Sequence, residues 1–221
     1  MNWFTKFVDS SLGKKLVMSL TGFFLVLFLI EHLIGNLLLL LSDHGKTFTA
    51  YSEFMASPRN ILIRIVEILL FIFLIYHIIN GVRLWWGNNQ SRPVKYRMKN
   101  PSENSTFFSR FMIQSGTLIF IFLVIHLNTF FIPYRFGHPT NTMYEGAVAA
   151  FSNAWYSWFY VLAMILLAFH LVHGVQSAFQ TLGIRHNKYT IFIKQCGIAF
   201  SILLCAGFAI IPLFFLFGGG S

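Results

Sequence analysis

The sequence contains 221 residues, of which 56% are hydrophobic and only 10% are charged. A soluble globular domain averages about 25% charged residues, so this composition excludes that class and indicates an integral membrane protein. The formal net charge is +9, but the basic residues stand in short segments between apolar runs. That pattern is typical of membrane topology and not of a nucleic-acid-binding surface.

Five apolar segments are long enough to cross a bilayer as helices, which requires about 20 residues each. A short aromatic segment with Trp3, Phe4 and Phe7 precedes them and is predicted to lie at the membrane interface. The first apolar run is too long for a secretory signal peptide and lacks a cleavage site. We therefore predict an all-α integral membrane protein, with one domain over residues 1–217, a linker or tail at 218–221, and spans at 15–42, 60–86, 109–133, 154–182 and 190–216.

The basic residues predict the direction of these spans. Segments on the N-terminal side carry twelve lysines and arginines, and segments on the opposite side carry four. The positive-inside rule then places the N-terminus in the cytoplasm and the C-terminus outside. The twelve are Lys6, Lys14, Lys15, Arg83, Arg92, Lys95, Arg97, Lys99, Arg110, Arg185, Lys188 and Lys194, and the four are Lys46, Arg59, Arg64 and Arg135.

Histidines are the unusual residues of the spans. His44, His138 and His186 fall in loops, where an ordinary solvated side chain is expected. Polar side chains at membrane depth are costly and normally face a partner inside the bundle. One such residue is explained by an interhelical hydrogen bond, but four spans share five of them: His32, His77, His126, His170 and His173.

Imidazole in its neutral form is a ligand for iron, zinc and copper. No carboxylate or thiolate cluster accompanies these histidines, and Cys196 and Cys205 do not form a Cys-x-x-Cys pair. Iron in a porphyrin fits such a site, because the macrocycle supplies the other ligands and a four-helix bundle provides a slot for the ring. The sequence therefore predicts haem bound between four of the five spans.

A repeat between spans two and four indicates where that slot lies. Residues 76–82, with His77 and Gly81, match residues 169–175, with His170 and Gly174. Positions four apart share a helix face, so each glycine removes side-chain bulk one turn from an imidazole. Close packing of small residues is the alternative explanation of the glycines.

Depth along the helices suggests how the histidines pair. His32 is 17 residues from Lys15 and His126 is 16 residues from Arg110, so both lie about 25 Å from the inner boundary. His77 is six residues from Arg83, or about 9 Å from that boundary. We predict an outer haem between His32 and His126 and an inner haem between His77 and span four, where depth favours His173 and the glycine offset favours His170, our preferred ligand.

Together these motifs resemble the five-helix, dihaem cytochrome b subunit of succinate:quinone oxidoreductase, or complex II, including the related fumarate reductases. The resemblance covers essentially the whole chain. The matching elements are Gly13-Lys14-Lys15, residues 31–36 around His32, Tyr76-His77 to Gly81, Ile125-His126-Leu127, Phe169-His170 to Gly174, and Gly183.

The resemblance implies that His32 and His126 ligate one haem b and that His77 and His170 ligate a second, with His173 as a secondary candidate. It also implies a flavoprotein with FAD and an iron–sulfur subunit at the cytoplasmic face of a bacterial membrane. Electrons pass between these partners and a membrane quinone, expected to be menaquinone, while dicarboxylate chemistry stays on the partners. A higher oligomer is left open. Some relatives carry a glutamate proton route where this chain has Ala168, so that route is not predicted.

Three ionisable residues lie in the outer halves of their spans: Glu31, Arg64 and Glu67. A carboxylate near the outer haem is suited to exchange the quinone proton. A structural ion pair, such as Arg64 with a loop acid, explains the same residues.

Three other functions are consistent with parts of the pattern. The chain could anchor another haem-linked dehydrogenase, such as a hydrogenase or a formate dehydrogenase, or transport solutes with a histidine proton relay. A membrane di-iron oxygenase is disfavoured, because His170-x-x-His173 is a single pair where such enzymes have several dense histidine boxes.

Overall fold

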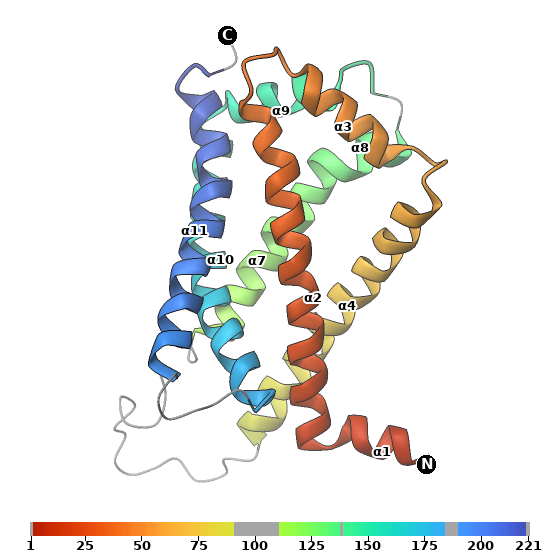
Figure 1. Ribbon diagram of the computed structural model, residues 1–221, viewed down its shortest axis with the longest axis vertical. Helices are drawn as coiled ribbons and strands as arrows, with labels where there is room; N and C mark the ends of the chain where they lie inside the picture. Colours follow the sequence, from red (N-terminus) through yellow and green to blue (C-terminus); the bar gives the residue numbers. More distant parts are fainter. Residues whose placement is uncertain (1, 91–110, 138, 184–189, 220–221) are drawn as a thin grey trace.

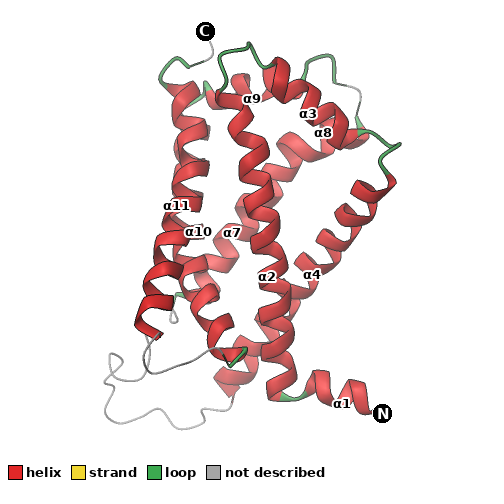
Figure 2. Ribbon diagram, in the orientation of Figure 1, coloured by secondary structure: helices red, strands yellow, loops and turns green. Residues whose placement is uncertain are grey.

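The structure is a computed structural model that describes residues 2–90, 111–137, 139–183 and 190–219. All regular structure in this part of the chain is helical (Figure 2). Five helical spans in it are long and apolar enough to cross a membrane, at 11–40, 61–90, 112–136, 154–181 and 190–216. The prediction of an all-α membrane protein with five spans is confirmed, with helix ends shifted by a few residues.

The first span is α2 (Ser11–Leu37), which continues into a 3-10 turn, η1 (Leu38–Leu40). A short helix, α1 (Trp3–Asp9), precedes it at the aromatic segment and runs at a steep angle to it (Figure 1). Ser10 separates the two helices, and its hydroxyl accepts a hydrogen bond from the Gly13 amide, which caps α2. An ion pair between Asp9 and Arg83, 3.1 Å long, joins this corner to the second span.

The second span is α4 (Ile61–Gln90). It lies against α2 near its C-terminal end and leans away toward its N-terminal end, where α3 (Lys46–Ala56) bridges the separation (Figure 1). Asn80 fixes the close end, because its buried amide donates to the Lys14 carbonyl at 2.8 Å. An amide buried at this depth needs such a partner.

The third span contains a break in the α-helix directly after its histidine. Helix α7 (Met112–His126) passes into a π-helical turn, η2 (Leu127–Phe131), and then into α8 (Ile132–Phe136). In the π-turn the Ile132 amide bonds to the Leu127 carbonyl five residues back. Pro133 follows and has no amide hydrogen to donate. Such turns frequently mark functional sites.

The last two spans form the tightest part of the bundle. Helix α10 (Ala154–Thr181) packs along α11 (Thr190–Leu216), and its other sides contact α2 and α7. The small buried hydroxyl of Ser157 donates to the Phe151 carbonyl just ahead of α10, and that of Ser201 donates to the Gly197 carbonyl within α11, which lets the helices approach closely. Ahead of α10, helix α9 (Met143–Phe151) begins with a capping box between Thr142 and Glu145.

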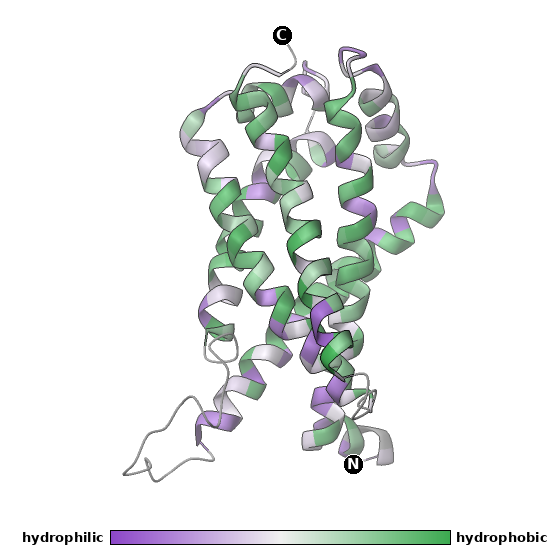
Figure 3. Cartoon of the chain, turned by 60° about the vertical axis from the view of Figure 1, so that its left-hand side comes forward, coloured by the Kyte–Doolittle hydropathy of each residue, from purple (hydrophilic) through white to green (hydrophobic). Residues whose placement is uncertain are grey.

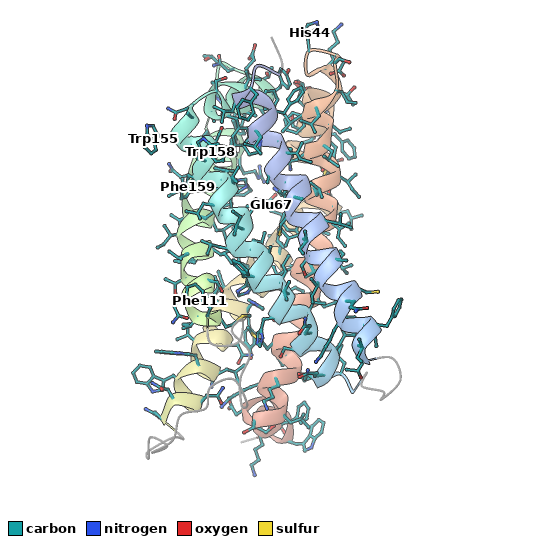
Figure 4. All side chains as sticks on the ribbon, turned by 90° about the vertical axis from the view of Figure 1, so that its left-hand side faces the viewer. His44, Glu67, Phe111, Trp155, Trp158 and Phe159 are labelled. Atoms are coloured by element: carbon teal, nitrogen blue, oxygen red, sulfur yellow. The ribbon has the colours of Figure 1, made fainter. Side chains whose placement is uncertain are left out.

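Hydropathy divides the molecule along its long axis. Apolar residues cover the middle of the spans and polar residues gather at both ends (Figure 3). Trp155 and Trp158 project outward from the start of α10, and His44 stands at the tip of the connection between α2 and α3 (Figure 4). This is the distribution expected when the central band faces lipid. The predicted basic residues at 92–99, 110, 185 and 188, and the loop histidines at 138 and 186, lie outside the described residues.

Candidate functional site

The five intramembrane histidines line one cavity between α2, α4, α7 and α10. Its volume is about 3040 Å³, several times the roughly 300–1,000 Å³ of a usual small-molecule pocket. Its walls are mostly apolar. The cavity is therefore large enough for more than one extended cofactor.

His32 and His126 face each other across the cavity, with ring centroids 5.9 Å apart and planes at 89°. Aromatic rings from the same helices stack on both imidazoles: Phe28 on His32 and Phe122 on His126. The Nδ1 atom of His126 lies 3.0 Å from the Tyr160 hydroxyl. His32 Nδ1 is 3.4 Å from the amide of Asn36, which donates to the His32 carbonyl at 2.7 Å. We call these two residues the 32/126 pair.

His77 and His170 form a second pair, the 77/170 pair, with ring centroids 6.4 Å apart and planes at 62°. Each imidazole has a hydroxyl beside its Nδ1 atom. The Thr21 hydroxyl is 3.3 Å from His77 Nδ1, and the Ser115 hydroxyl is 3.5 Å from His170 Nδ1. Of the two span-four histidines, His170 is therefore the one that stands opposite His77.

The spacing of both pairs fits two imidazoles on opposite sides of one metal ion. Imidazole nitrogen binds a metal ion at about 2.0–2.1 Å, so the ring centroids of two such ligands are roughly 6 Å apart. The observed separations are 5.9 Å and 6.4 Å. Ligation leaves each ring free to rotate about its metal–nitrogen direction, so neither interplanar angle conflicts with it.

The donor set favours iron in a porphyrin over a bare ion. Within the described residues, no group of three or more histidine, cysteine, aspartate or glutamate side chains is placed to hold a metal ion. An ion between either pair would therefore need its remaining ligands from elsewhere, and a porphyrin supplies four nitrogens in one plane. The residues present fit haem at both pairs.

Glycines on all four helices line the cavity. A β-carbon on Gly174 would meet no atom within 4 Å, and one on Gly81 would meet only the flexible end of Met18. Close helix packing therefore does not explain Gly174. Instead, the two predicted glycines border open space beside the histidines.

Sequence reasoning missed two further glycines, Gly22 and Gly116. A β-carbon on Gly22 would lie 3.4 Å from His77 Cε1, and one on Gly116 would lie 3.6 Å from His170 Cε1. The signal was a second internal repeat: Thr21-Gly22 and Ser115-Gly116 each stand ten residues, counted from the glycine, before a histidine of the 32/126 pair. Helices α2 and α7 therefore carry the two histidines of the 32/126 pair. The same two helices carry the hydroxyls and glycines that contact the 77/170 pair.

Three charged side chains of the cavity, Arg64, Glu67 and Arg135, gather where α4 begins and where α8 continues the third span. The Glu67 carboxylate pairs with Arg64 on its own helix and with Arg135 on α8, where Nε is 3.3 Å from Oε1. Arg64 also donates to the Met55 carbonyl, and its buried Nε has no hydrogen-bond partner among the described residues. Arg64 does form an ion pair, as the alternative explanation held, but its carboxylate partner is Glu67, one helical turn away on α4, and not a loop acid.

Glu31 lies on the surface side of α2, where its carboxylate accepts a hydrogen bond of 2.8 Å from the Tyr51 hydroxyl. Tyr51 packs over Gly35, where any β-carbon would collide with its ring. Burial of Tyr51, together with the neighbouring carboxylate, raises the pKa of this tyrosine. Glu31 is thus held by a side chain from α3 and is separate from the Glu67 cluster.

Comparison with known proteins bears on the first half of this site. Residues 16–96 match the family described as the succinate dehydrogenase/fumarate reductase transmembrane subunit. The matched segment contains His32, Glu67 and His77. No curated protein and no solved structure gives a significant match. Over residues 16–96 the chain is similar to the membrane subunits of succinate dehydrogenase and fumarate reductase, which supports the family that the histidine motifs predict.

Proposed function

We propose that this chain is the dihaem cytochrome b subunit that anchors complex II in the membrane. His32 and His126 hold one haem b, and His77 and His170 hold the other. The observation that carries the proposal is the pair of imidazole separations, 5.9 Å and 6.4 Å, in one large cavity. The family match over two of the four helices supports the same function. Bound haem supplies a one-electron carrier at each pair.

In this function the chain links soluble partners to the lipid phase. A flavoprotein with FAD and an iron–sulfur subunit dock at the basic, cytoplasmic side, nearer the 77/170 pair. Electrons of succinate oxidation or fumarate reduction pass between those partners and a quinone in the membrane, for which we propose menaquinone. The positive-inside count supports this orientation, with the N-terminus in the cytoplasm of a bacterium.

The quinone site is proposed beside the Glu67 cluster. Arg64 Nε is a buried donor with no partner among the described residues, and a quinone carbonyl is an acceptor that would satisfy it. Glu67 can exchange the quinone proton, while Arg64 and Arg135 hold its carboxylate in place. Glu31, bonded to Tyr51, is the second candidate for a proton position.

The test is a redox titration of the purified native complex, with haem counted per copy of this chain and co-purifying subunits identified. Two bis-imidazole b centres with separate midpoint potentials, together with a flavoprotein of complex II type, are the expected result. One haem per chain would overturn the pairing. A nickel or molybdenum partner would assign the anchor to another dehydrogenase, and a colourless protein would support a histidine relay.

A further inference from the structure

We infer that Tyr160, Tyr156 and Thr129 form a directed chain of hydroxyl groups that fixes the tautomer of His126 and thereby sets the potential of the haem it holds. The inference rests on the proposed function, because it assigns these hydroxyls to one ligand of the 32/126 pair. It concerns positioning residues that stand behind the imidazole and do not touch the iron.

The hydrogen-bonded series begins at His126 on α7 and continues through two tyrosines on α10. It then returns to the third span, where it ends at a backbone carbonyl of α7. His126 Nδ1 lies 3.0 Å from the Tyr160 hydroxyl, which lies 3.0 Å from the Tyr156 hydroxyl. Tyr156 donates to the Thr129 hydroxyl at 2.9 Å, and Thr129 donates to the Ile125 carbonyl at 3.0 Å. The last acceptor thus belongs to the residue that precedes His126.

The direction of every bond follows from that last acceptor. A carbonyl oxygen can only accept, and each hydroxyl has one proton to donate. Thr129 gives its proton to Ile125, so it can only accept from Tyr156. Tyr156 has then used its proton and accepts from Tyr160. Tyr160 in turn can only accept from His126, so Nδ1 of His126 must carry the hydrogen.

A neutral imidazole protonated at Nδ1 has its lone pair at Nε2. That nitrogen is the one a metal needs, and ligating histidines commonly donate their other ring N–H to a fixed acceptor. The acceptor also raises the basicity of the ligand. The three hydroxyls therefore prepare His126 for iron before the cofactor arrives.

Burial keeps this chain in place. Tyr160 is 6% exposed, and its ring packs edge-on against Phe122 and Phe151. Thr129, the last hydroxyl of the series, lies in the π-turn η2. The break in the helix after His126 therefore contains a residue of the hydrogen-bonded series. A water molecule is not needed at any step, because each donor has a protein acceptor within 3.0 Å.

The other pair has a simpler arrangement that serves as an internal comparison. Thr21 donates to the Val17 carbonyl at 2.9 Å and Ser115 donates to the Met112 carbonyl at 3.0 Å. Their hydroxyls lie 3.3 Å and 3.5 Å from His77 and His170, longer than the 3.0 Å contact at His126. In the part of the chain that the structure describes, His126 is the one intramembrane histidine connected to a relay of several hydroxyls.

The experiment measures the midpoint potentials and low-spin ferric spectra of both haems in the native complex and in five variants. Tyr160→Phe removes the acceptor of the His126 N–H, so ferric iron loses ligand basicity and the potential of one haem should rise while the other is unchanged. Tyr156→Phe and Thr129→Val change residues that do not contact His126. Each should raise the potential of the same haem by less than Tyr160→Phe does. Tyr144 lies on α9 and is not one of the linked hydroxyls. Tyr144→Phe should therefore leave both potentials at the native values.

Thr129→Ser keeps a hydroxyl at the end of the chain and should restore the native potential that Thr129→Val loses. If Tyr160→Phe assembles poorly, the Tyr156→Phe and Thr129→Val measurements decide the matter. Unchanged potentials in those two variants, with two haems still bound, would overturn the inference and leave the proposed function intact. A native complex without two haems would instead overturn the proposed function.

Discussion

The imidazole of His170 packs over Gly116, with its Cε1 atom 3.6 Å from the position that a β-carbon of Gly116 would take. His77 has the same relationship to Gly22, at 3.4 Å. The 77/170 pair therefore lies between two glycines of α2 and α7. The 32/126 pair lies between stacked phenylalanines. The two haem sites that we propose both use two imidazoles, but the residues that pack against those imidazoles are glycines at one site and phenylalanines at the other.

Enlarging Gly116 is expected to remove the haem of the 77/170 pair. A β-carbon alone would make an ordinary contact of 3.6 Å with His170, so Gly116→Ala should keep two haems. Gly116→Val adds two further carbons against the ring, and overpacking of this kind costs about 1–3 kcal/mol. Haem per chain, measured from the reduced spectrum, should fall from two to about one in the valine variant only. Equal haem content in both variants would contradict the packing.

Removing single histidines should separate the two sites. We expect His126→Ala to lose one b centre and His77→Ala to lose the other, because one remaining imidazole holds iron poorly. His170→Ala should match His77→Ala, while His173→Ala keeps both centres. The measurement is the redox titration of each purified variant complex. Loss of a centre in His173→Ala but not in His170→Ala would assign the fourth ligand to His173.

Neutralising Glu67 should impair quinone chemistry without disturbing the haems. Glu67→Gln keeps the shape of the side chain but removes the proton-exchanging group, and such groups typically contribute about 10²–10⁴-fold to a rate. We expect quinone turnover to fall by at least about tenfold, with both haem spectra unchanged. Glu53→Gln, an exposed carboxylate on α3 that does not line the cavity, is the matched control. Unchanged turnover in Glu67→Gln would remove Glu67 from the mechanism and leave it a structural partner of Arg64 and Arg135.

Tyr51 should make the protein more sensitive to alkali. Burial and Glu31 raise its pKa in the folded state above the value of about 10 for an unfolded chain. Stability from the protonated tyrosine is therefore complete below about pH 10 and declines as the pH rises above it. Between about pH 10 and pH 11.5, the thermal midpoint should fall further in the native protein than in Tyr51→Phe. Parallel declines in the two proteins would contradict this.

Several elements could not be read from the sequence because their signals are short. The connections before α4 and α10 contain α3 and α9, which the hydropathy pattern treats as loops. For α9 a signal did exist, since Thr142 and Glu145 have the spacing of a capping box. The π-turn after His126 leaves no comparable mark, because Asn128 and Thr129 among apolar residues are equally compatible with an uninterrupted α-helix.

The five spans and the set of intramembrane histidines follow from the order of the amino acids alone. A bilayer requires about 20 apolar residues in each helix and tolerates buried polar groups only with partners, so both features are written in local composition. Depth along the spans also suggested which histidines share a level, and the same rings face each other in the structure. Whether the N-terminus is cytoplasmic stays a prediction.

Which side chains stand behind the histidines depends on how the helices pack in three dimensions. Gly22, Gly116, Tyr160 and Arg135 act across helix boundaries, and their contacts depend on how far each helix is tilted and rotated against its neighbours. Those angles come from packing along the full length of the bundle. A repeat such as Thr21-Gly22 and Ser115-Gly116 is visible in the sequence, but its meaning appears only when α2 and α7 lie against the histidines of α4 and α10.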